Sequence, residues 1–247
     1  MKRINAKNRC VLVIGDLHLP SHHPQAIEFL DCIRVYLKEY SGKEPLIISI
    51  GDECDWQSVN FHEKDGYVPS SKIEYEQLLE MLHGQGGLYT TFNNMDILDS
   101  NHGSLLLRRI RYAKLFDEVM KPLSEIYQTK NWRWHNEIIL ETTKGDIYLC
   151  HGRSKNGLRL LNQVGTRGVI QGHFHSKFEI CYYSRKGGQD RFSAFTGCLI
   201  NPDARAFSYG SLHLTRPLLG SIAIMDDGEP LLFKMQLDNK GNWTGYL

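Results

Sequence analysis

Five short apolar runs in this chain each stop at a polar cluster that contains aspartate, asparagine or histidine. The clusters are GDLH, GDECD, SNHG, CHG and GHFH, at residues 15–18, 51–55, 100–103, 150–152 and 172–175. An apolar run that ends at such a cluster is typical of a buried strand that ends in a loop. Because ligands of open α/β sheets bind at the carboxyl ends of the strands, the repetition predicts one shared site at one sheet edge.

The segments around these clusters favour an α/β fold. Apolar residues between 27 and 40 follow helical spacing, and Gly42 supplies a helix end between strands at residues 10–14 and 46–50. Further helices are expected over about 72–83, 105–113, 120–127 and 158–164. Further strands are expected near residues 95–98, 136–142, 146–152, 168–175, 178–184, 191–197, 221–227 and 230–237. This order predicts a four-layer α/β/β/α sandwich, in which two mixed β-sheets are flanked by helices.

Length and charge limit the organisation of the chain and its partners. With 247 residues and 41% hydrophobic content, the chain can bury a large core, and we expect a single domain over residues 1–247. It would carry an excursion at about 56–92 and a strand-rich C-terminal part. The formal net charge of +1 gives no global signal for nucleic acid or for an acidic surface. Any affinity for phosphate must therefore be local.

The start of the chain contains only a five-residue apolar run, at residues 10–14. Such a run is too short for a signal peptide or a membrane span. We therefore expect a cytoplasmic protein with no membrane partner, while the oligomeric state stays open.

The residue types at the strand ends point to a transition-metal site. Asp16 and His18 are two residues apart, as are His173 and His175, so in extended segments each pair would lie on one side. Carboxylates, imidazoles and an asparagine amide suit Mn, Fe, Zn or Ni better than Ca or Mg. Because no candidate ligand is a thiol, the pattern does not indicate a structural zinc site.

In their order and spacing the five clusters resemble the signature of the calcineurin-like metallophosphoesterase superfamily, over residues 10–175. The resemblance implies two divalent transition-metal ions, with Mn as the first candidate and Fe, Zn or Ni as alternatives. One ion would be held by Asp16, His18 and His175, the other by Asn101, His151 and His173, with Asp52 bridging both. It also implies that His102 is the general acid and that Asp55 holds it in the right tautomer.

The implied activity is hydrolysis of a phosphate ester by a metal-bridging hydroxide. Trp56 follows Asp55 where protein Ser/Thr phosphatases carry a phosphate-binding arginine, which favours a phosphodiester substrate, in a nucleotide or nucleic acid, over a monoester. The alternatives are a phosphomonoesterase of the same mechanism, a nuclease subunit that needs a partner, and a non-catalytic scaffold with the same fold.

Two positions depart from the family pattern: Ser100 replaces a glycine and Gly103 replaces an acid. Ser100 fits the tight turn only if its φ is negative or strain is tolerated. A second, weaker resemblance, carried by residues 195–210 and 216–220, is to phosphoesterases encoded by bacteriophages. In that case the compartment would be the host cytoplasm.

Substrate contacts are less well defined by the sequence. The candidates are Trp56, His62, Arg153, Arg205 and Arg216. For Trp56, packing of the excursion against the core is an equally good interpretation of an aromatic residue. Arg108, Arg109 and Arg111 could attract phosphate, although a charged helix face is the commoner explanation.

Overall fold

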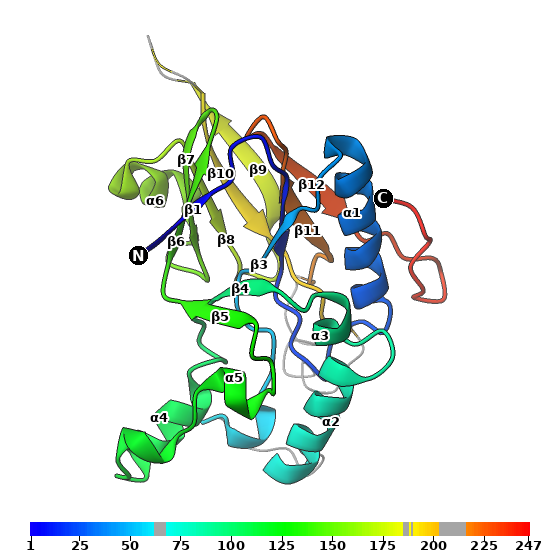
Figure 1. Cartoon of the computed structure of the whole chain (residues 1–247), viewed down its shortest axis with the longest axis vertical. Helices are drawn as coiled ribbons and strands as arrows, with labels where there is room; N and C mark the ends of the chain where they lie inside the picture. The colour runs from blue at the N-terminus through cyan, green and yellow to red at the C-terminus, as the bar shows by residue number, and fades with distance from the viewer. Residues whose placement is uncertain (62–67, 185–187, 189, 203–215) are drawn as a thin grey trace.

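The computed structural model describes residues 1–61, 68–184, 188, 190–202 and 216–247. Two six-stranded mixed sheets form the centre of the molecule (Figure 1). The first sheet has the order β12-β11-β2-β3-β4-β5, with β2 (Val11–Ile14), β3 (Leu46–Ser49), β4 (Met95–Leu98), β5 (Trp132–His135), β11 (Gly220–Ile224) and β12 (Pro230–Lys234). The strands β2 to β5 are parallel neighbours, and β11 and β12 continue the sheet in antiparallel pairing.

The second sheet has the order β1-β6-β7-β8-β10-β9. Its strands are β1 (Lys2–Asn5), β6 (Ile138–Thr142), β7 (Gly145–Cys150), β8 (Gly168–Gln171), β9 (Phe178–Tyr183) and β10 (Arg191–Thr196). The central strands β7, β8 and β10 are parallel, and β6 and β9 flank them as antiparallel strands. The carboxyl ends of β7 and β8 therefore lie at the same edge of this sheet.

Three apolar cores hold the layers together. Val13 and Ile48 of the first sheet pack against Leu149 and Ile170 of the second. The alternate residues of β2, such as Leu12, face the helices on the other side of the first sheet. Because both faces of β2 are covered, its whole sequence is apolar instead of alternating.

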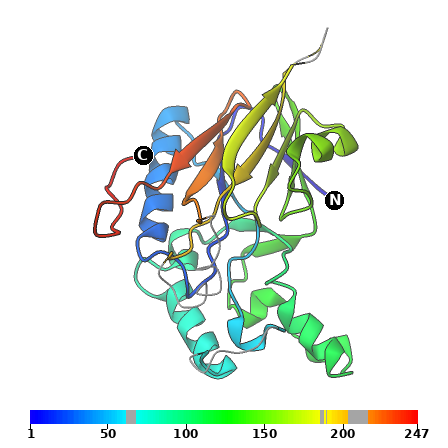
Figure 2. The same cartoon turned by 180° about the vertical axis from the view of Figure 1, so that it is seen from behind.

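Helices form the two outer layers, and Figures 1 and 2 show α1 and α6 on opposite sides of the sheets. The first layer contains α1 (Ala26–Ser41), α2 (Ser71–His83) and α3 (Leu88–Thr91), and the second contains α6 (Gly157–Val164). Helix α1 ends at Gly42, whose φ of 68° is left-handed. The α/β/β/α sandwich predicted from the sequence is therefore confirmed.

Several elements differ from the sequence-based expectation. Strands β1 and β5 were not expected, and β8 ends at Gln171, before the two histidines that follow it. The helix expected over 120–127 is shortened to α5 (Leu123–Ile126), because Pro122 disfavours helix in the residues before it; a 3₁₀ turn, η2 (Asp117–Val119), precedes it. The excursion contains η1 (Gln57–Val59) before α2. Within the described residues, no helix is long and apolar enough to cross a membrane.

Candidate metal centre and active site

The five polar clusters meet at one place, at the carboxyl ends of strands from both sheets. Asp16, Asp52 and Asn101 follow β2, β3 and β4 of the first sheet, whereas His151 and His173 follow β7 and β8 of the second. The strand ends thus carry side chains toward one site, as the sheet topology predicts.

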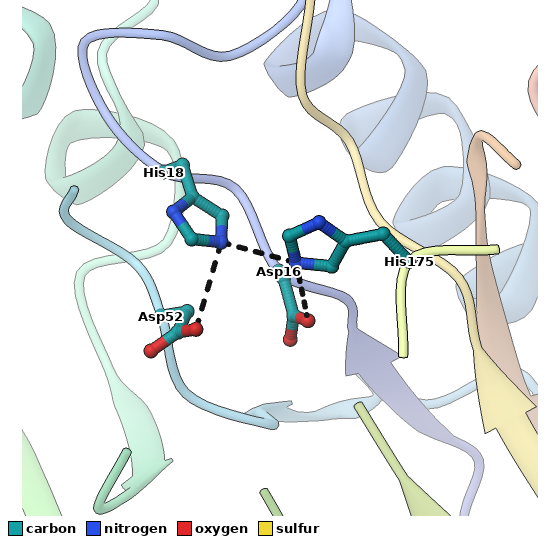
Figure 3. A group of neighbouring side chains, drawn as sticks. All are labelled: Asp16, His18, Asp52 and His175. Atoms are coloured by element: carbon teal, nitrogen blue, oxygen red, sulfur yellow. Dashed lines mark hydrogen bonds and ion pairs between the residues drawn. The ribbon is translucent and has the colours of Figure 1, made fainter. Parts of the chain in front are cut away.

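The first group of side chains consists of Asp16, His18, Asp52 and His175 (Figure 3). One possible ligand atom from each lies within 4.8 Å of the others. The Nε2 atom of His18 is 3.5 Å from Asp52 Oδ2 and 3.2 Å from His175 Nε2. His175 Nε2 in turn lies 3.3 Å from Asp16 Oδ2. Two carboxylates and two imidazoles therefore converge on one point.

The second group shares Asp52 with the first and adds His151 and His173. His151 Nε2 lies 3.1 Å from Asp52 Oδ2 and 2.7 Å from Asn101 Oδ1. His173 Nδ1 is 3.1 Å from the same asparagine oxygen. The structure thus brings together all seven residues predicted as metal ligands, with Asp52 between the two groups.

The donor set fits divalent transition-metal ions. Asp16, His18 and Asp52 are buried, with relative exposures of 0 to 1%, and Asp16 Oδ1 has no hydrogen-bond partner in the described part of the chain. The ion pairs of Asp16 and Asp52 within those residues are with histidines only. Buried carboxylates need a compensating charge, and the nearby histidines supply one only when protonated, whereas divalent cations would supply it permanently.

The backbone conformation that directs these side chains into the site differs from the expected one. His18, Asp52 and His173 have positive φ values of 54°, 50° and 67°. The prediction that each Asp-x-His or His-x-His pair lies along an extended segment is therefore wrong, because left-handed turns aim these side chains. A left-handed residue other than glycine costs about 1 to 2 kcal/mol, and such strain concentrates at functional sites.

Two glycines of the motifs make room for the site. A Cβ atom on Gly172 would lie 2.4 Å from Asp16 Oδ1, so only glycine permits this close approach. Gly51 has a φ of 104°, and a Cβ there would lie 2.7 Å from the Cβ of Ser100 and 3.0 Å from His151 Nδ1. The Gly-Asp and Gly-His pairs in the sequence thus have a steric cause.

His102 and Asp55 form a pair beside the first group. Asp55 Oδ1 lies 3.2 Å from His102 Nδ1 and 3.3 Å from His18 Nδ1, and the rings of His18 and His102 are 4.6 Å apart. Asp55 therefore orients two histidines, of which the sequence predicted only His102. Carboxylates behind metal-binding histidines commonly fix the ring and its tautomer.

The pair is strongly polarised. Burial lowers the pKa of His102, but the hydrogen bond with Asp55 and the charge of Asp52 outweigh it and raise this pKa to about 9. Burial acts to raise the pKa of Asp55, yet His102 and His18 bring it down to about 2. At neutral pH this environment favours an imidazolium at His102 and a carboxylate at Asp55.

Similar forces act on the acid shared by both groups. Burial would raise the pKa of Asp52, but the hydrogen bond from His151 and the charges of His151, His18 and His102 lower it. Its Oδ1 atom also accepts a hydrogen bond from the backbone N–H of His102, at 3.1 Å. Asp52 is thus held ionised, as a ligand to a cation must be.

Three of the five predicted substrate contacts lie within the described residues, and there none of their side chains bonds to a residue of the metal centre. Trp56 is 4% exposed, donates to Tyr127 Oη at 2.8 Å and stacks on Tyr75, so it packs in the core and forms no open aromatic wall. Arg153 follows His151 closely, but its guanidinium pairs with Glu137. Arg216 is exposed. His62 and Arg205 lie outside the described residues.

One supporting residue, Gln171, was not identified from the sequence. Its buried side chain accepts hydrogen bonds from the backbone N–H groups of Arg153 and Ser154, at 2.9 and 3.1 Å, and so holds the loop after His151. In the sequence, the only signal for Gln171 is its position, at the end of an apolar run and immediately before the Gly-His pair.

No family model matches the sequence, and no curated protein matches it. Solved structures similar to this fold include a Vps29 double mutant from Entamoeba histolytica, at 15% identity and a TM-score of 0.47, with 94% of each chain covered. A structure described as a novel archaeal phosphodiesterase has 13% identity and a TM-score of 0.45, over 91% of this chain and 99% of that one. Vps29 from Chaetomium thermophilum has 13% identity and a TM-score of 0.45, over 96% and 92%.

These similarities are weak, so the fold class rests on the observed sheet order and layers. They give no support to the predicted bacteriophage relationship. Residues 203–210 of the motif behind that prediction lie outside the described residues.

Proposed function

We propose that this chain is a binuclear metal-dependent phosphoesterase of the calcineurin-like type and that it hydrolyses a phosphodiester in a nucleotide or nucleic acid. The observation that carries the proposal is the pair of ligand groups that share Asp52, with His102 and Asp55 beside them. No single cluster would suffice, because acid and histidine clusters also occur in structural ion pairs.

In this proposal, Asp16, His18 and His175 would hold one ion, and Asn101, His151 and His173 would hold the other. Asp52, which lies between the two groups, would serve both. When bound, divalent ions such as Mn²⁺ supply Lewis-acid chemistry and make a water molecule acidic enough to attack phosphorus at neutral pH. Two such ions against two carboxylates leave a surplus of about two positive charges, which a phosphate anion complements.

His102 acts as the general acid. Its Nδ1 atom faces Asp55, which leaves Nε2 to donate a proton to the oxygen of the leaving group. The ion pair with Asp55 favours the protonated ring, so a proton is available for the leaving group. The side chain is 23% exposed, so a substrate can reach it from solvent.

The preference for a phosphodiester over a monoester rests on Trp56. The position after Asp55 carries this buried side chain and no phosphate-clamping arginine. Rates on bis(p-nitrophenyl) phosphate and p-nitrophenyl phosphate with Mn²⁺ test the preference. A much faster monoester reaction would make the chain a phosphomonoesterase of the same mechanism.

The general acid is tested by His102→Gln. We expect kcat to fall by about 10²- to 10⁴-fold, the usual effect of removing a general acid, while metal content stays at the wild-type level. His83→Gln is a matched control, because His83 lies on α2 and its Nε2 bonds the carbonyl of Tyr127. Loss of metal from His102→Gln would instead make His102 a ligand.

The two remaining alternatives give different results. A scaffold would show no metal-dependent turnover of any phosphate ester. A nuclease subunit would act on DNA or RNA only after a partner protein is added.

A further inference from the structure

Helix α4 (Leu105–Tyr112) begins directly after the loop that carries Asn101 and His102. Figure 1 shows it projecting from the body of the molecule at the lower left, away from both sheets. Leu105 is its only buried residue. The helix therefore contributes little to the core, although it lies beside the candidate active site.

The segment from Leu105 to Lys121 concentrates positive charge. It contains five basic and two acidic residues, a formal net charge of +3, while the whole chain has +1. The basic residues are Arg108, Arg109, Arg111, Lys114 and Lys121. Within the described residues, neither Arg108 nor Arg109 pairs with a carboxylate, since their contacts are with carbonyl oxygens and an aromatic ring.

Aromatic rings are interleaved with these charges. Phe61 is 42% exposed and Tyr112 is 74% exposed, and their rings lie 5.6 Å apart, edge to face. The guanidinium of Arg109 sits 3.9 Å from the centre of the Phe61 ring, and that of Arg108 sits 5.2 Å from it. We call these four residues the aromatic-arginine platform. Its parts hold one another in place and leave ring surface open to solvent.

The platform is continuous with the candidate metal centre. Arg108 Nη1 donates to the backbone carbonyl of Asn101 at 3.4 Å, and the side chain of Asn101 belongs to the second ligand group. A helix of this length spans about 12 Å. A nucleic acid with one phosphate at the centre could therefore lay its next few nucleotides along α4.

We propose that the aromatic-arginine platform binds single-stranded nucleic acid next to the phosphodiester that the metal centre cleaves. This deepens the proposed function and rests on it for the bond that is cut. Exposed rings stack on unpaired bases, and arginines attract the phosphates between them, which is how proteins bind single strands without sequence preference. Duplex bases are already stacked and present no free face to Tyr112.

Two other occupants fit less well. A membrane surface needs a broad apolar helix face that is open to solvent, whereas the apolar residues Leu106, Leu107 and Ile110 of α4 are half-buried in the protein. An acidic protein would pair with the charges but would leave the exposed rings of Phe61 and Tyr112 unexplained.

Binding is tested with fluorescently labelled oligo-dT and oligo-U, followed by anisotropy in the presence of EDTA. We expect Tyr112→Ala and Arg109→Ala each to weaken binding about tenfold, and Tyr112→Trp to retain it, because a larger ring still stacks. A plot of the logarithm of the binding constant against the logarithm of the salt concentration should also be less steep for Arg109→Ala. The slope should decrease in magnitude by about 0.7, the value for one lost phosphate contact to a single strand. Comparing the two oligomers shows whether the strand is DNA or RNA.

Tyr40→Ala and Arg159→Ala are the matched controls. Tyr40 is an exposed tyrosine on α1, and Arg159 is an exposed arginine on α6. Both controls should bind as the wild type does. The proposal would be overturned if all variants bound the oligonucleotides equally, or if duplex bound more tightly than single strands. It would also be overturned if the variants weakened binding to anionic vesicles but not to oligonucleotides.

The outcomes separate this inference from the proposed function, because binding in EDTA requires no turnover. In kinetics, kcat/KM on an oligonucleotide divided by kcat/KM on bis(p-nitrophenyl) phosphate should fall about tenfold in Tyr112→Ala. If turnover is absent but the variants weaken binding, the platform stands and the phosphoesterase fails. If turnover is present but the ratio and the binding are unchanged, the platform fails and the phosphoesterase stands.

Discussion

Two clusters in this molecule place histidine against buried aspartate, and they have opposite characters. In the candidate metal centre, Asp16 and Asp52 face imidazoles and an asparagine amide. In the second cluster, on β4 and β5, Asp96 accepts hydrogen bonds from Arg133 Nε at 3.0 Å and Nη2 at 2.8 Å, and it lies 2.7 Å from His135 Nε2.

The difference lies in the arginine. Burial acts to raise the pKa of Asp96, but Arg133 and His135 lower it, so a permanent cation already compensates this carboxylate. Its oxygens are occupied by a planar fork of donors and are not left to a metal. Acid and histidine together therefore do not define a metal site. A metal site is indicated where several donor atoms converge and no arginine or lysine already compensates the carboxylates.

The largest effect that separates the two clusters is expected from Asp52→Asn. The amide cannot serve both ligand groups as the carboxylate does, so both ions should be lost or disordered. Turnover should fall more than about 100-fold, since even outer-shell changes cost 10- to 100-fold in metal affinity or activity. Metal content by mass spectrometry and rates on bis(p-nitrophenyl) phosphate measure this.

Asp96→Asn is the matched control for that experiment. It changes another buried aspartate in contact with a histidine, but one that also pairs with Arg133. It should keep its metals and its turnover. Two full metal equivalents in Asp52→Asn would contradict the bridging role.

Metal binding should also stabilise the whole fold, and this stabilisation should depend on the metal centre and not on the cluster at Asp96. Ligand at about 100 times its Kd adds about 2.7 kcal/mol of stability, or about 5 to 10 °C in Tm for a chain of this size. Adding Mn²⁺ to the chelator-treated wild type and to Asp96→Asn should produce this shift, and Asp52→Asn should not respond. Thermal unfolding followed by circular dichroism measures it, and an equal shift in all three proteins would mean that the ions bind elsewhere.

A smaller effect is expected on stability from Asp96→Asn. The lost hydrogen bonds should cost about 1 kcal/mol, at the low end for charged partners because Arg133 is half exposed. Since the folded-state pKa of Asp96 is lowered, the difference from wild type should be fully present above the ordinary aspartate pKa of about 3.9. It should be lost as the pH falls through the lower folded-state pKa. Urea unfolding across this range measures it, and a difference independent of pH would point to packing and not to charge.

Local pattern predicted the centre of the molecule well, because strands such as β2 are defined by short apolar runs and end at their polar clusters. It failed where distant contacts decide. Strand β1 is polar and exposed, and its partner is β6, more than a hundred residues away. The fate of Trp56 depends on Tyr127, and the left-handed turns at His18 and His173 have no local signature. For the same reason the arginine cluster at Asp96 was not foreseen, since β5 was not expected.

The smallest expected effect concerns the two departures from the family pattern, Ser100 and Gly103. Ser100 is not among the described residues with positive φ, so the serine itself is accommodated. Its Oγ accepts a hydrogen bond from the Gly103 N–H at 3.0 Å, and a Cβ on Gly103 would also lie 3.0 Å from that oxygen. The two departures are thus complementary, because the serine occupies the space that a side chain at 103 would need.

Gly103→Asp alone should therefore destabilise the chain more than the double change Ser100→Gly with Gly103→Asp. Residues in contact typically couple by about 0.5 to 3 kcal/mol, and here we expect the lower end, because the crowded atom is a rotatable hydroxyl. A double-mutant cycle of urea unfolding, with metal content checked in each variant, measures the coupling. Additive effects of the two changes would mean that the loop carrying Asn101 and His102 adapts to each departure independently. A favourable coupling would instead mean that Ser100 sets the geometry of this loop, in the same way that Arg133 makes Asp96 an ion-pair residue and not a metal ligand.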